Sequence, residues 1–367
     1  LVAMAQQGEN RALLQPFNEQ GAVHLFLGRV EEGLPSTADQ LIYGHVLVEG
    51  ELVQQIGLRL GRSVAAGDFD GDGACDLVVS SINWSFDEVQ LNREDGGVFL
   101  YRGRHAEADE EGGLESTPSR IWAANLETSV GTRFGYELAM ADINDDGMSD
   151  LLVSQPRYKV PGQSGGNHGA LNLFWGEPLA NHPPEVLIPP SEAAWRGLGP
   201  LPNVLFGHDV HIADVGLNGS LDLIVADPRG INDEGVRSGV VYVYEYVSES
   251  GVSDPPTEVV AGIAAQDYFG TGVTVVDGVV AVMASRDDAH GLDVGCPYKT
   301  TDGESLPLAF PGIGTGDAYG QSVSFTGDLT GDGLEDLAVG VPMEDAVELG
   351  ANAGVVMIYR GTTTGVE

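Results

Sequence analysis

DFDGDGACDLVVS, from Asp68 to Ser80, is the stretch that decides the fold, and the chain repeats its pattern three more times. The other copies are DINDDGMSDLLVS from Asp142, DVGLNGSLDLIVA from Asp214 and DLTGDGLEDLAVG from Asp328. Each copy is an acidic nine-residue loop followed at once by an apolar run whose length and β-branched residues are typical of a strand. The glycine at loop position 6 permits the sharp turn that such a loop needs. The pattern predicts short strands joined by acidic turns.

Oxygen-bearing side chains at loop positions 1, 3, 5 and 9 can converge on a hard cation such as Ca²⁺, with the carbonyl oxygen of position 7 as a fifth donor. We expect three such Ca²⁺ sites and a fourth, degenerate loop in which Gly216 replaces the position 3 ligand. The expected ligands are Asp68, Asp70, Asp72, Asp76 and the Ala74 carbonyl; Asp142, Asn144, Asp146, Asp150 and the Met148 carbonyl; Asp328, Thr330, Asp332, Asp336 and the Leu334 carbonyl; and, in the degenerate loop, Asp214, Asn218 and Asp222.

Two other interpretations of the loops compete with this one. An EF-hand also opens with D-x-D-x-D-G, but it needs a glutamate at position 12 and flanking helices. Position 12 here is Val79, Val153 or Val339, so the EF-hand is excluded. A plain Asp-Gly turn between strands would explain one loop. Three loops with oxygen donors at matching positions favour a cation.

The repeat extends beyond the loop. An aromatic or leucine residue followed by glycine comes before each acidic run, and a further apolar strand follows it after a variable loop. The first steps are Leu60-Gly61, Phe134-Gly135, Phe206-Gly207, Phe269-Gly270 and Tyr319-Gly320; the later strands are GGVFLYRG from Gly96, GALNLFWG from Gly169, SGVVYVYEY from Ser238 and AGVVMIYRG from Ala353. The copy at Phe269 lacks the acidic loop, and we expect Asp277-Gly278 to join its two strands as a tight hairpin.

These repeats predict an all-β chain, a β-propeller of four-stranded blades with six repeat units, closing as a ring of six or seven blades. We expect one domain over residues 1–367, with a partial first blade at 1–55, because LVAMAQ and GAVHLFLG match the second and third strands of a repeat. The other expected blades span about 56–128, 129–200, 201–262, 263–314 and 315–367, the last without an outer strand. A short helical piece is expected near Ser191–Arg196.

Composition narrows the classes of function. The formal net charge of −38 disfavours a nucleic-acid-binding face and attraction to anionic lipid. The sequence has no apolar run long enough to cross a bilayer, so direct membrane insertion is not expected. Its two cysteines, Cys75 and Cys296, lie in distant repeats, and Cys75 is expected to be a small buried filler rather than half of a disulfide.

F-G, an apolar stretch and then D-x-D-x-D-G-x-x-D-L-x-V-G/S-x-P resembles the FG-GAP repeat, which builds the seven-bladed propeller of integrin α-subunits. The likeness covers nearly the whole chain and is specific in Phe134–Pro156, Phe206–Pro228, Tyr319–Pro342 and Gly61–Ser80, and weak from Ser285 to Thr315. It implies Ca²⁺ in the acidic loops, an extracellular or cell-surface location, and adhesion. Similar repeats occur in glycosylphosphatidylinositol-specific phospholipase D, in which catalysis belongs to a separate domain.

The expected function is a calcium-stabilised extracellular scaffold that binds a protein or glycan partner through variable loops. Those loops, Ser81–Gly96, Gln155–Gly169 and Asp227–Gly239, carry Trp84, Phe86, Arg157, Tyr158, His168 and Arg229 as candidate contacts. One alternative is a structural subunit that polymerises through its incomplete terminal blades. Another is the non-catalytic propeller of a secreted hydrolase. No enzyme activity is expected, because G-x-S-x-G, H-E-x-x-H and a convincing Cys-His pair are absent from the sequence.

Overall fold

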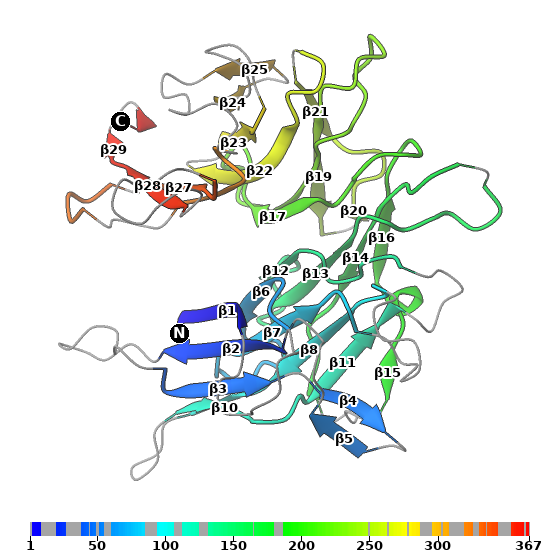
Figure 1. The fold of residues 1–367 in the computed structure, drawn as a ribbon, viewed down its shortest axis with the longest axis vertical. Coiled ribbons are helices and arrows are strands. Elements are labelled where there is room, and N and C mark those ends of the chain that lie inside the picture. The colour runs from blue at the N-terminus through cyan, green and yellow to red at the C-terminus, as the bar shows by residue number, and fades with distance from the viewer. Residues whose placement is uncertain are drawn as a thin grey trace. The chain divides into compact units, whose positions relative to one another are not determined.

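Strands dominate the structure, a computed structural model (Figure 1). It describes residues 2–8, 20–26, 38–43, 45–48, 51–54, 60–84, 94–105, 112–124, 131–163, 165–179, 186–248, 250–262, 264–276, 279–286, 296–301, 304–307, 319–325, 330–334, 336–343, 354–362 and 365–366. The chain divides into two compact units, residues 1–198 and 199–367. No helix among the described residues is long and apolar enough to cross a membrane.

The first unit contains three main sheets of consecutive strands. Their main-path strands are antiparallel neighbours, as expected for repeats in which each strand pairs with the next. The sheets are β1 (Val2–Gly8), β2 (Gln20–Phe26) and β3 (Gln40–Tyr43); β6 (Val64–Gly67), β7 (Asp76–Ser81), β8 (Gly97–Tyr101) and β11 (Arg120–Ala123), with β15 (Leu187–Ile188) added parallel to β11; and β12 (Leu138–Ala141), β13 (Asp150–Gln155), β14 (Ala170–Phe174) and β16 (Trp195–Leu198). Two hairpins complete it, β4 (His45–Val48) with β5 (Glu51–Gln54), and β9 (Gly103–Arg104) with β10 (Gly113–Leu114).

The second unit repeats the same strand order. Its last sheet has three described strands, so β28 has no described strand on its outer side. The sheets are β17 (Asp209–Ala213), β18 (Asp222–Asp227), β19 (Val240–Val247) and β21 (Glu258–Ala261), with β20 (Gly251–Val252) extending β19; β22 (Phe269–Val276), β23 (Val279–Ala284), β24 (Cys296–Thr301) and β25 (Glu304–Pro307); and β26 (Ser322–Phe325), β27 (Leu337–Val341) and β28 (Val355–Tyr359). A hairpin of β29 (Gly361–Thr362) and β30 (Gly365–Val366) follows.

Two sequence expectations about local structure have clear outcomes. β22 and β23 pair directly, with Val276 opposite Val279, so the copy without an acidic loop joins its strands as expected; Asp277 and Gly278 themselves lie outside the described residues. The helical piece expected near Ser191–Arg196 is only a three-residue 3-10 helix, η4 (Pro190–Glu192). Trp195 and Arg196 belong instead to β16, because that segment pairs with β14 and completes the sheet.

Within each unit, the aromatic-glycine step packs where one sheet meets the sheet before it. The first residues of the steps, Leu60, Phe134, Phe206, Phe269 and Tyr319, are all buried. Each following glycine has a positive φ, between 75° and 95°, and the glycine at 135 donates its N–H to the Ser154 carbonyl. In addition, a Cβ on Gly96 would lie 2.0 Å from the Phe134 carbonyl oxygen. Glycine is therefore required on both sides of this junction.

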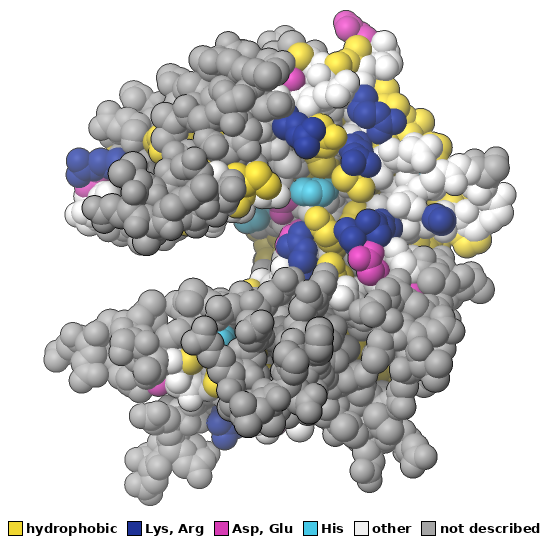
Figure 2. Space-filling model, in the orientation of Figure 1, with side chains coloured by type: hydrophobic (Ala, Val, Ile, Leu, Met, Phe, Trp, Pro, Cys, Tyr) yellow, Lys and Arg dark blue, Asp and Glu magenta, His cyan; other side chains and the backbone are white. Residues whose placement is uncertain are grey.

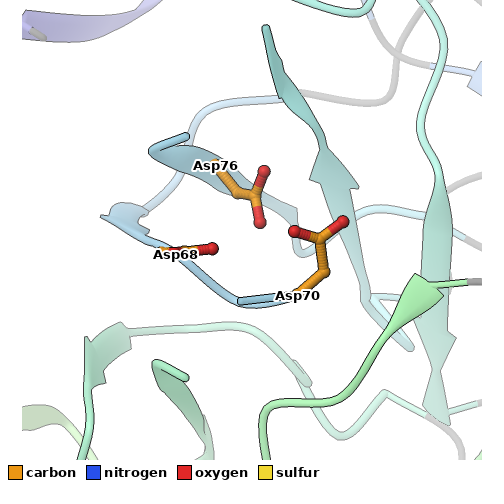
Figure 3. A group of neighbouring side chains, drawn as sticks. All are labelled: Asp68, Asp70 and Asp76. Atoms are coloured by element: carbon orange, nitrogen blue, oxygen red, sulfur yellow. The ribbon is translucent and has the colours of Figure 1, made fainter. Parts of the chain in front are cut away.

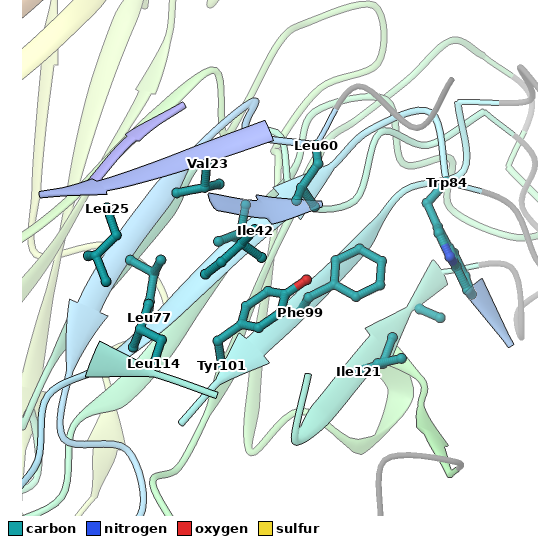
Figure 4. Packing of buried hydrophobic residues seen from close by; sticks show 12 residues of the cluster. Val23, Leu25, Ile42, Leu60, Leu77, Trp84, Phe99, Tyr101, Leu114 and Ile121 are labelled. Atoms are coloured by element: carbon teal, nitrogen blue, oxygen red, sulfur yellow. The ribbon is translucent and has the colours of Figure 1, made fainter. Parts of the chain in front are cut away.

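Packing alternates along the central strands, as strand geometry dictates. In β8, Phe99 and Tyr101 point into a core with Val23 and Ile42 of the first sheet (Figure 4). Val98 and Leu100 point the other way, into a core with Phe134, Leu138 and Leu151 of the next sheet. The second sheet is thus covered on both faces, which explains why β7 and β8 are buried along their whole length.

The structure confirms an all-β chain of successive small sheets, an architecture that fits a β-propeller. The number of blades, the blade boundaries and the joining of both units in one ring stay predictions.

Candidate metal centre

All four acidic loops join the first strand of a sheet to its second strand. They connect β6 to β7, β12 to β13, β17 to β18 and β26 to β27. Because each first strand runs antiparallel to its second, the loops lie at equivalent ends of their sheets. The described part of the last loop is Thr330–Leu334 and Asp336; Asp328 lies outside the described residues.

The position 1 carboxylate holds the turn of each described loop. In the second loop, Asp142 Oδ1 accepts the N–H of Asp146 at 3.0 Å and Oδ2 accepts that of Gly147 at 2.8 Å. The same two bonds, to positions 5 and 6, occur at Asp68 (3.1 and 2.8 Å) and at Asp214 (2.8 and 2.9 Å). Aspartate favours such turns because its side chain bonds nearby backbone N–H groups. The loop conformation is therefore set by the chain itself.

The position 9 carboxylate is buried and ties the loop to the sheet. Asp150 Oδ2 accepts the N–H of Ile143 at 2.9 Å, and Oδ1 accepts the N–H of Gly176 at 2.8 Å, which follows the third strand. Asp76 makes the equivalent bonds to Phe69 and Gly103. Burial raises the pKa of Asp76, Asp150 and Asp222 to about 6, although the backbone N–H groups oppose this shift. A cation and a proton would therefore compete for the position 9 carboxylate.

Position 4 has a left-handed backbone in every loop, which the sequence pattern did not indicate. Its residues are Gly71 (φ 72°), Asp145 (φ 58°), Leu217 (φ 55°) and Gly331 (φ 77°). The position 6 glycines share this conformation, as expected, with φ between 85° and 88°. Glycine adopts this conformation most easily. Glycine stands at position 4 in only two of the loops, and Asp145 and Leu217 stand there in the others, so the sequence does not reveal that position 4 is left-handed.

The first loop brings three carboxylates together. Ligand oxygens of Asp68, Asp70 and Asp76 all lie within 4.8 Å of one another (Figure 3). A set of clustered, partly buried carboxylate oxygens fits a hard cation such as Ca²⁺, which takes oxygen ligands at 2.3–2.6 Å. Asp72, expected as the fourth side-chain ligand, is not part of this cluster: its Oδ1 accepts the N–H of Ala74 at 2.8 Å.

The second and last loops use position 5 in the same way. Asp146 Oδ1 accepts the N–H of Met148, and its Oδ2 accepts the amide of Asn144 at 3.0 Å. In the last loop, Asp332 Oδ1 accepts the N–H of Leu334 at 3.0 Å. The buried Asp336 accepts the N–H of Thr330 at 2.8 Å. The metal-ligand roles of these side chains, and of the Ala74, Met148 and Leu334 carbonyls, stay predictions.

The degenerate loop has the same backbone turn and the same position 1 hydrogen bonds as the first two loops, but fewer carboxylates. Asp222 accepts the N–H of Val215, and Asn218 Oδ1 accepts that of Ser220, both at 2.8 Å. Although Gly216 at position 3 has no side-chain donor atom, the loop keeps its shape because oxygens of Asp214, Asn218 and Asp222 accept backbone N–H groups. The loop therefore folds in the same way with a smaller set of oxygen donors.

Consecutive loops of the first unit are bonded to each other. The N–H of Ser149, at position 8 of the second loop, donates to the carbonyl of Asp68, at position 1 of the first, at 2.6 Å. The N–H of Glu177 donates to the carbonyl of Phe69 at 3.0 Å. An ion that fixes one loop would thus also fix its neighbour.

Arginine side chains at two loops were not among the expected site residues. Arg102 Nη2 donates to Asp72 Oδ2 at 2.6 Å, and its Nε lies 2.9 Å from Asp70 Oδ2. Arg360 Nε donates to Asp332 Oδ2 at 2.7 Å. The signal for both was the repeated Tyr-Arg-Gly at the end of two third strands, 101–103 and 359–361.

Some expectations about exposure were wrong. Cys75 is exposed, and the buried place is taken by Ala74 beside it, because the turn directs position 7 inward. Trp84, Tyr158 and His168 are buried and so present little surface to a partner; Trp84 packs edge-on against Phe99. Arg157 and Arg229 of the same candidate group remain accessible, whereas Phe86 lies outside the described residues.

The chain is similar to proteins of two kinds. The FG-GAP repeat family matches residues 319–359. Human phosphatidylinositol-glycan-specific phospholipase D is 31% identical over 174 residues, which cover 47% of this chain and 19% of that protein. Integrin alpha-PS5 of Drosophila melanogaster is 32% identical over 180 residues (48% of this chain, 15% of that protein), and integrin alpha-4 of Xenopus laevis is 32% identical over 125 residues (34% and 10%). The matches thus span about a fifth or less of the length of these relatives.

Solved structures give a more distant likeness. A thermostable family-43 glycoside hydrolase superposes with a TM-score of 0.42 at 12% identity, covering 84% of this chain and 93% of that one. A likeness at this level indicates nothing about the chemistry of this chain.

Proposed function

We propose that this chain, an FG-GAP repeat protein that resembles integrin α-subunits, is a calcium-stabilised β-propeller that serves outside the cell as an adhesion or protein-interaction scaffold. In this proposal the sheets form one closed ring of six or seven blades. Ca²⁺ fills the first, second and last acidic loops, and the loop at Asp214 is weak or empty. The phospholipase relatives do not make the chain catalytic: it is a non-enzymatic module, as the sequence predicts.

The observation that carries the proposal is the first loop. Its carboxylates lie within 4.8 Å of one another on a turn that backbone N–H groups hold in place. Such a cluster is repulsive when empty, and a divalent cation removes the repulsion. Millimolar Ca²⁺ outside cells is enough to fill weak sites of this kind, which favours an extracellular location.

The partner is expected at the variable loops rather than at the strands. On the face that Figure 2 draws, the described side chains mix hydrophobic groups with both signs of charge. Arg157 and Arg229 are the accessible members of the expected contact group, and arginine often anchors protein or glycan contacts. With a net charge of −38, nucleic acid is not the proposed partner.

Removal of Ca²⁺ tests the calcium part of this proposal. Binding to the folded state alone stabilises by about 2.7 kcal/mol per loop at a 100-fold excess over Kd. We therefore expect excess chelator to lower the melting temperature by several degrees, and Ca²⁺, but not an equal ionic strength of Na⁺, to restore it. Differential scanning calorimetry measures this. Identical melting curves in chelator and in millimolar Ca²⁺ would refute the role of the cation.

A second function, self-assembly through an open blade, is favoured by the exposed side chains of β28. Val356 and Ile358 are 68% and 48% exposed. The corresponding residues of β8, Val98 and Leu100, are 0% exposed because the next sheet covers them. β28 is also the last strand of its sheet among the described residues. A second copy of this chain is the occupant that we propose.

Substitution of Val356 by lysine tests self-assembly. We expect the wild-type chain to associate with rising concentration in sedimentation velocity, and V356K to stay monomeric, because a charge on the apolar face opposes its burial. Val259, 50% exposed on β21 of a complete sheet, provides the matched control, and V259K should associate like the wild type. A wild-type chain that is monomeric at every concentration contradicts this second function.

A further inference from the structure

The residue that faces the position 9 aspartate from the third strand differs in charge between the loops. Strand register pairs Leu77 with Tyr101, Leu151 with Phe174, and Leu337 with Tyr359, so the next residues along the third strands face position 9. In the degenerate loop, Asp222 pairs directly with Glu245. The residues at this place are Arg102, Trp175, Glu245 and Arg360 in the first, second, third and last loops. The first and last loops therefore have a positively charged arginine side chain at this place.

In the first loop this guanidinium contacts two expected metal ligands at once. Arg102 Nε lies 2.9 Å from Asp70 Oδ2, and Nη2 lies 2.6 Å from Asp72 Oδ2. The Asp70 side chain is only 4% exposed, so this pair is better shielded from water than an ordinary surface ion pair. Because both oxygens of Asp72 are occupied, by Arg102 and by the N–H of Ala74, Asp72 stays apart from the cluster of Asp68, Asp70 and Asp76.

The last loop shows the same contact at the same position. Arg360 Nε lies 2.7 Å from Asp332 Oδ2, while Asp332 Oδ1 accepts the N–H of Leu334. In the second loop the corresponding oxygen, Asp146 Oδ2, accepts the neutral amide of Asn144 instead, and the facing residue is Trp175. Among the described residues, Asp146 forms no ion pair. Within that part of the chain, the second loop thus offers its position 5 carboxylate without a competing positive charge.

We propose that Arg102 and Arg360 are built-in counter-cations that compete with Ca²⁺ for the position 5 carboxylate, so that the second loop binds Ca²⁺ more tightly than the first and the last. This inference rests on the proposed function for the identity of the ion. The guanidinium occupies oxygens of Asp70 and Asp72 that a divalent cation would also use, so each weakens the binding of the other by the same factor. As Ca²⁺ falls, the first and last loops lose the ion first, and the arginine takes its place at the aspartate.

Arg102→Gln in the full-length chain tests the competition. A background with D146N and D332N weakens the second and last loops, so that isothermal titration calorimetry reports on the first. We expect R102Q to raise the Ca²⁺ affinity of the first loop roughly tenfold, because one partly shielded ion pair no longer opposes binding. R104Q removes the same charge from the exposed Arg104 two residues away, and it should leave the affinity within about twofold.

The reverse substitution supplies a second measurement. W175R places an arginine beside the second loop, and in a background of D72N and D332N it should lower the Ca²⁺ affinity of that loop roughly tenfold. In chelator, without any ion, R102Q should also melt at a lower temperature than R104Q, because Asp70 and Asp72 then lose their counter-cation. These three results together support the competition.

Two other outcomes overturn it, and they can be told apart. If the wild-type chain binds Ca²⁺ while R102Q and W175R leave the affinities unchanged, the arginines do not compete, and the proposed function still stands. If neither the wild-type chain nor R102Q binds Ca²⁺ at millimolar concentration, the proposed function and this inference fail together.

Discussion

Replacing Asp150 by alanine is expected to destabilise the chain by about 2–6 kcal/mol even in excess chelator. Asp150 is fully buried, and its two oxygens accept the N–H groups of Ile143 and Gly176. Alanine leaves both donors without an acceptor, and each buried unpaired donor costs about 1–3 kcal/mol. Because Gly176 follows β14, the loss also frees the end of the third strand from the loop.

Asp146→Asn is the matched control for this prediction. Asp146 is exposed, and asparagine keeps the Oδ1 acceptor for the N–H of Met148. We expect D146N to change the free energy of unfolding in chelator by less than about 1 kcal/mol, and to lose the part of the Ca²⁺-dependent stabilisation that the second loop supplies. Urea unfolding with and without Ca²⁺ separates the two effects. Equal losses for D150A and D146N in chelator would show that position 9 has no structural role beyond the ion.

The second large effect is expected at Trp122, in the fourth strand of its sheet. Its ring is 1% exposed and packs edge-on against Phe69, with centroids 5.5 Å apart, and at 51° against Phe174, at 5.8 Å. Phe69 is position 2 of the first acidic loop, and Phe174 ends the third strand of the next sheet. Trp122→Ala should therefore cost about 3–5 kcal/mol, as large cavities in packed cores do.

The same cavity should weaken the ion site. Phe69 lies between Asp68 and Asp70, so loss of its support loosens two clustered carboxylates, and we expect the Ca²⁺ affinity of the first loop to fall in W122A. Trp122→Phe, which leaves a smaller cavity, should lose less than about 2 kcal/mol in urea unfolding and keep the affinity. A W122A variant within 1 kcal/mol of the wild type would show that this junction does not hold the two sheets together.

Much of the local structure could be predicted because it depends on residues close together in the chain. The first three acidic loops begin and end where the sequence indicates, since the position 1 carboxylate bonds N–H groups only four and five residues away. The strands are predicted by alternating apolar residues. The direct pairing of β22 with β23, without an acidic loop, is predicted by the short spacing between their two apolar runs. The left-handed position 4 was missed because Asp145 and Leu217 occupy it as well as glycine.

The contacts that distinguish one loop from another were not predictable in this way. Asp76 accepts the N–H of Gly103, and Asp70 and Asp72 contact Arg102. These partners lie roughly thirty residues apart in the sequence, and the pairing of strands brings them together. The requirement for Gly96 comes from the Phe134 carbonyl of another sheet. These partners are set by register and by packing between sheets.

By itself, the sequence determined an all-β repeat chain with oxygen-rich turns, because turn chemistry and alternating hydrophobicity act over a few residues. Only the tertiary structure decided which carboxylates meet one another, which meet an arginine, and which side chains are buried. Those outcomes depend on groups that are far apart along the chain and that strand pairing brings within a few ångströms, where charge and hydrogen bonding act most strongly.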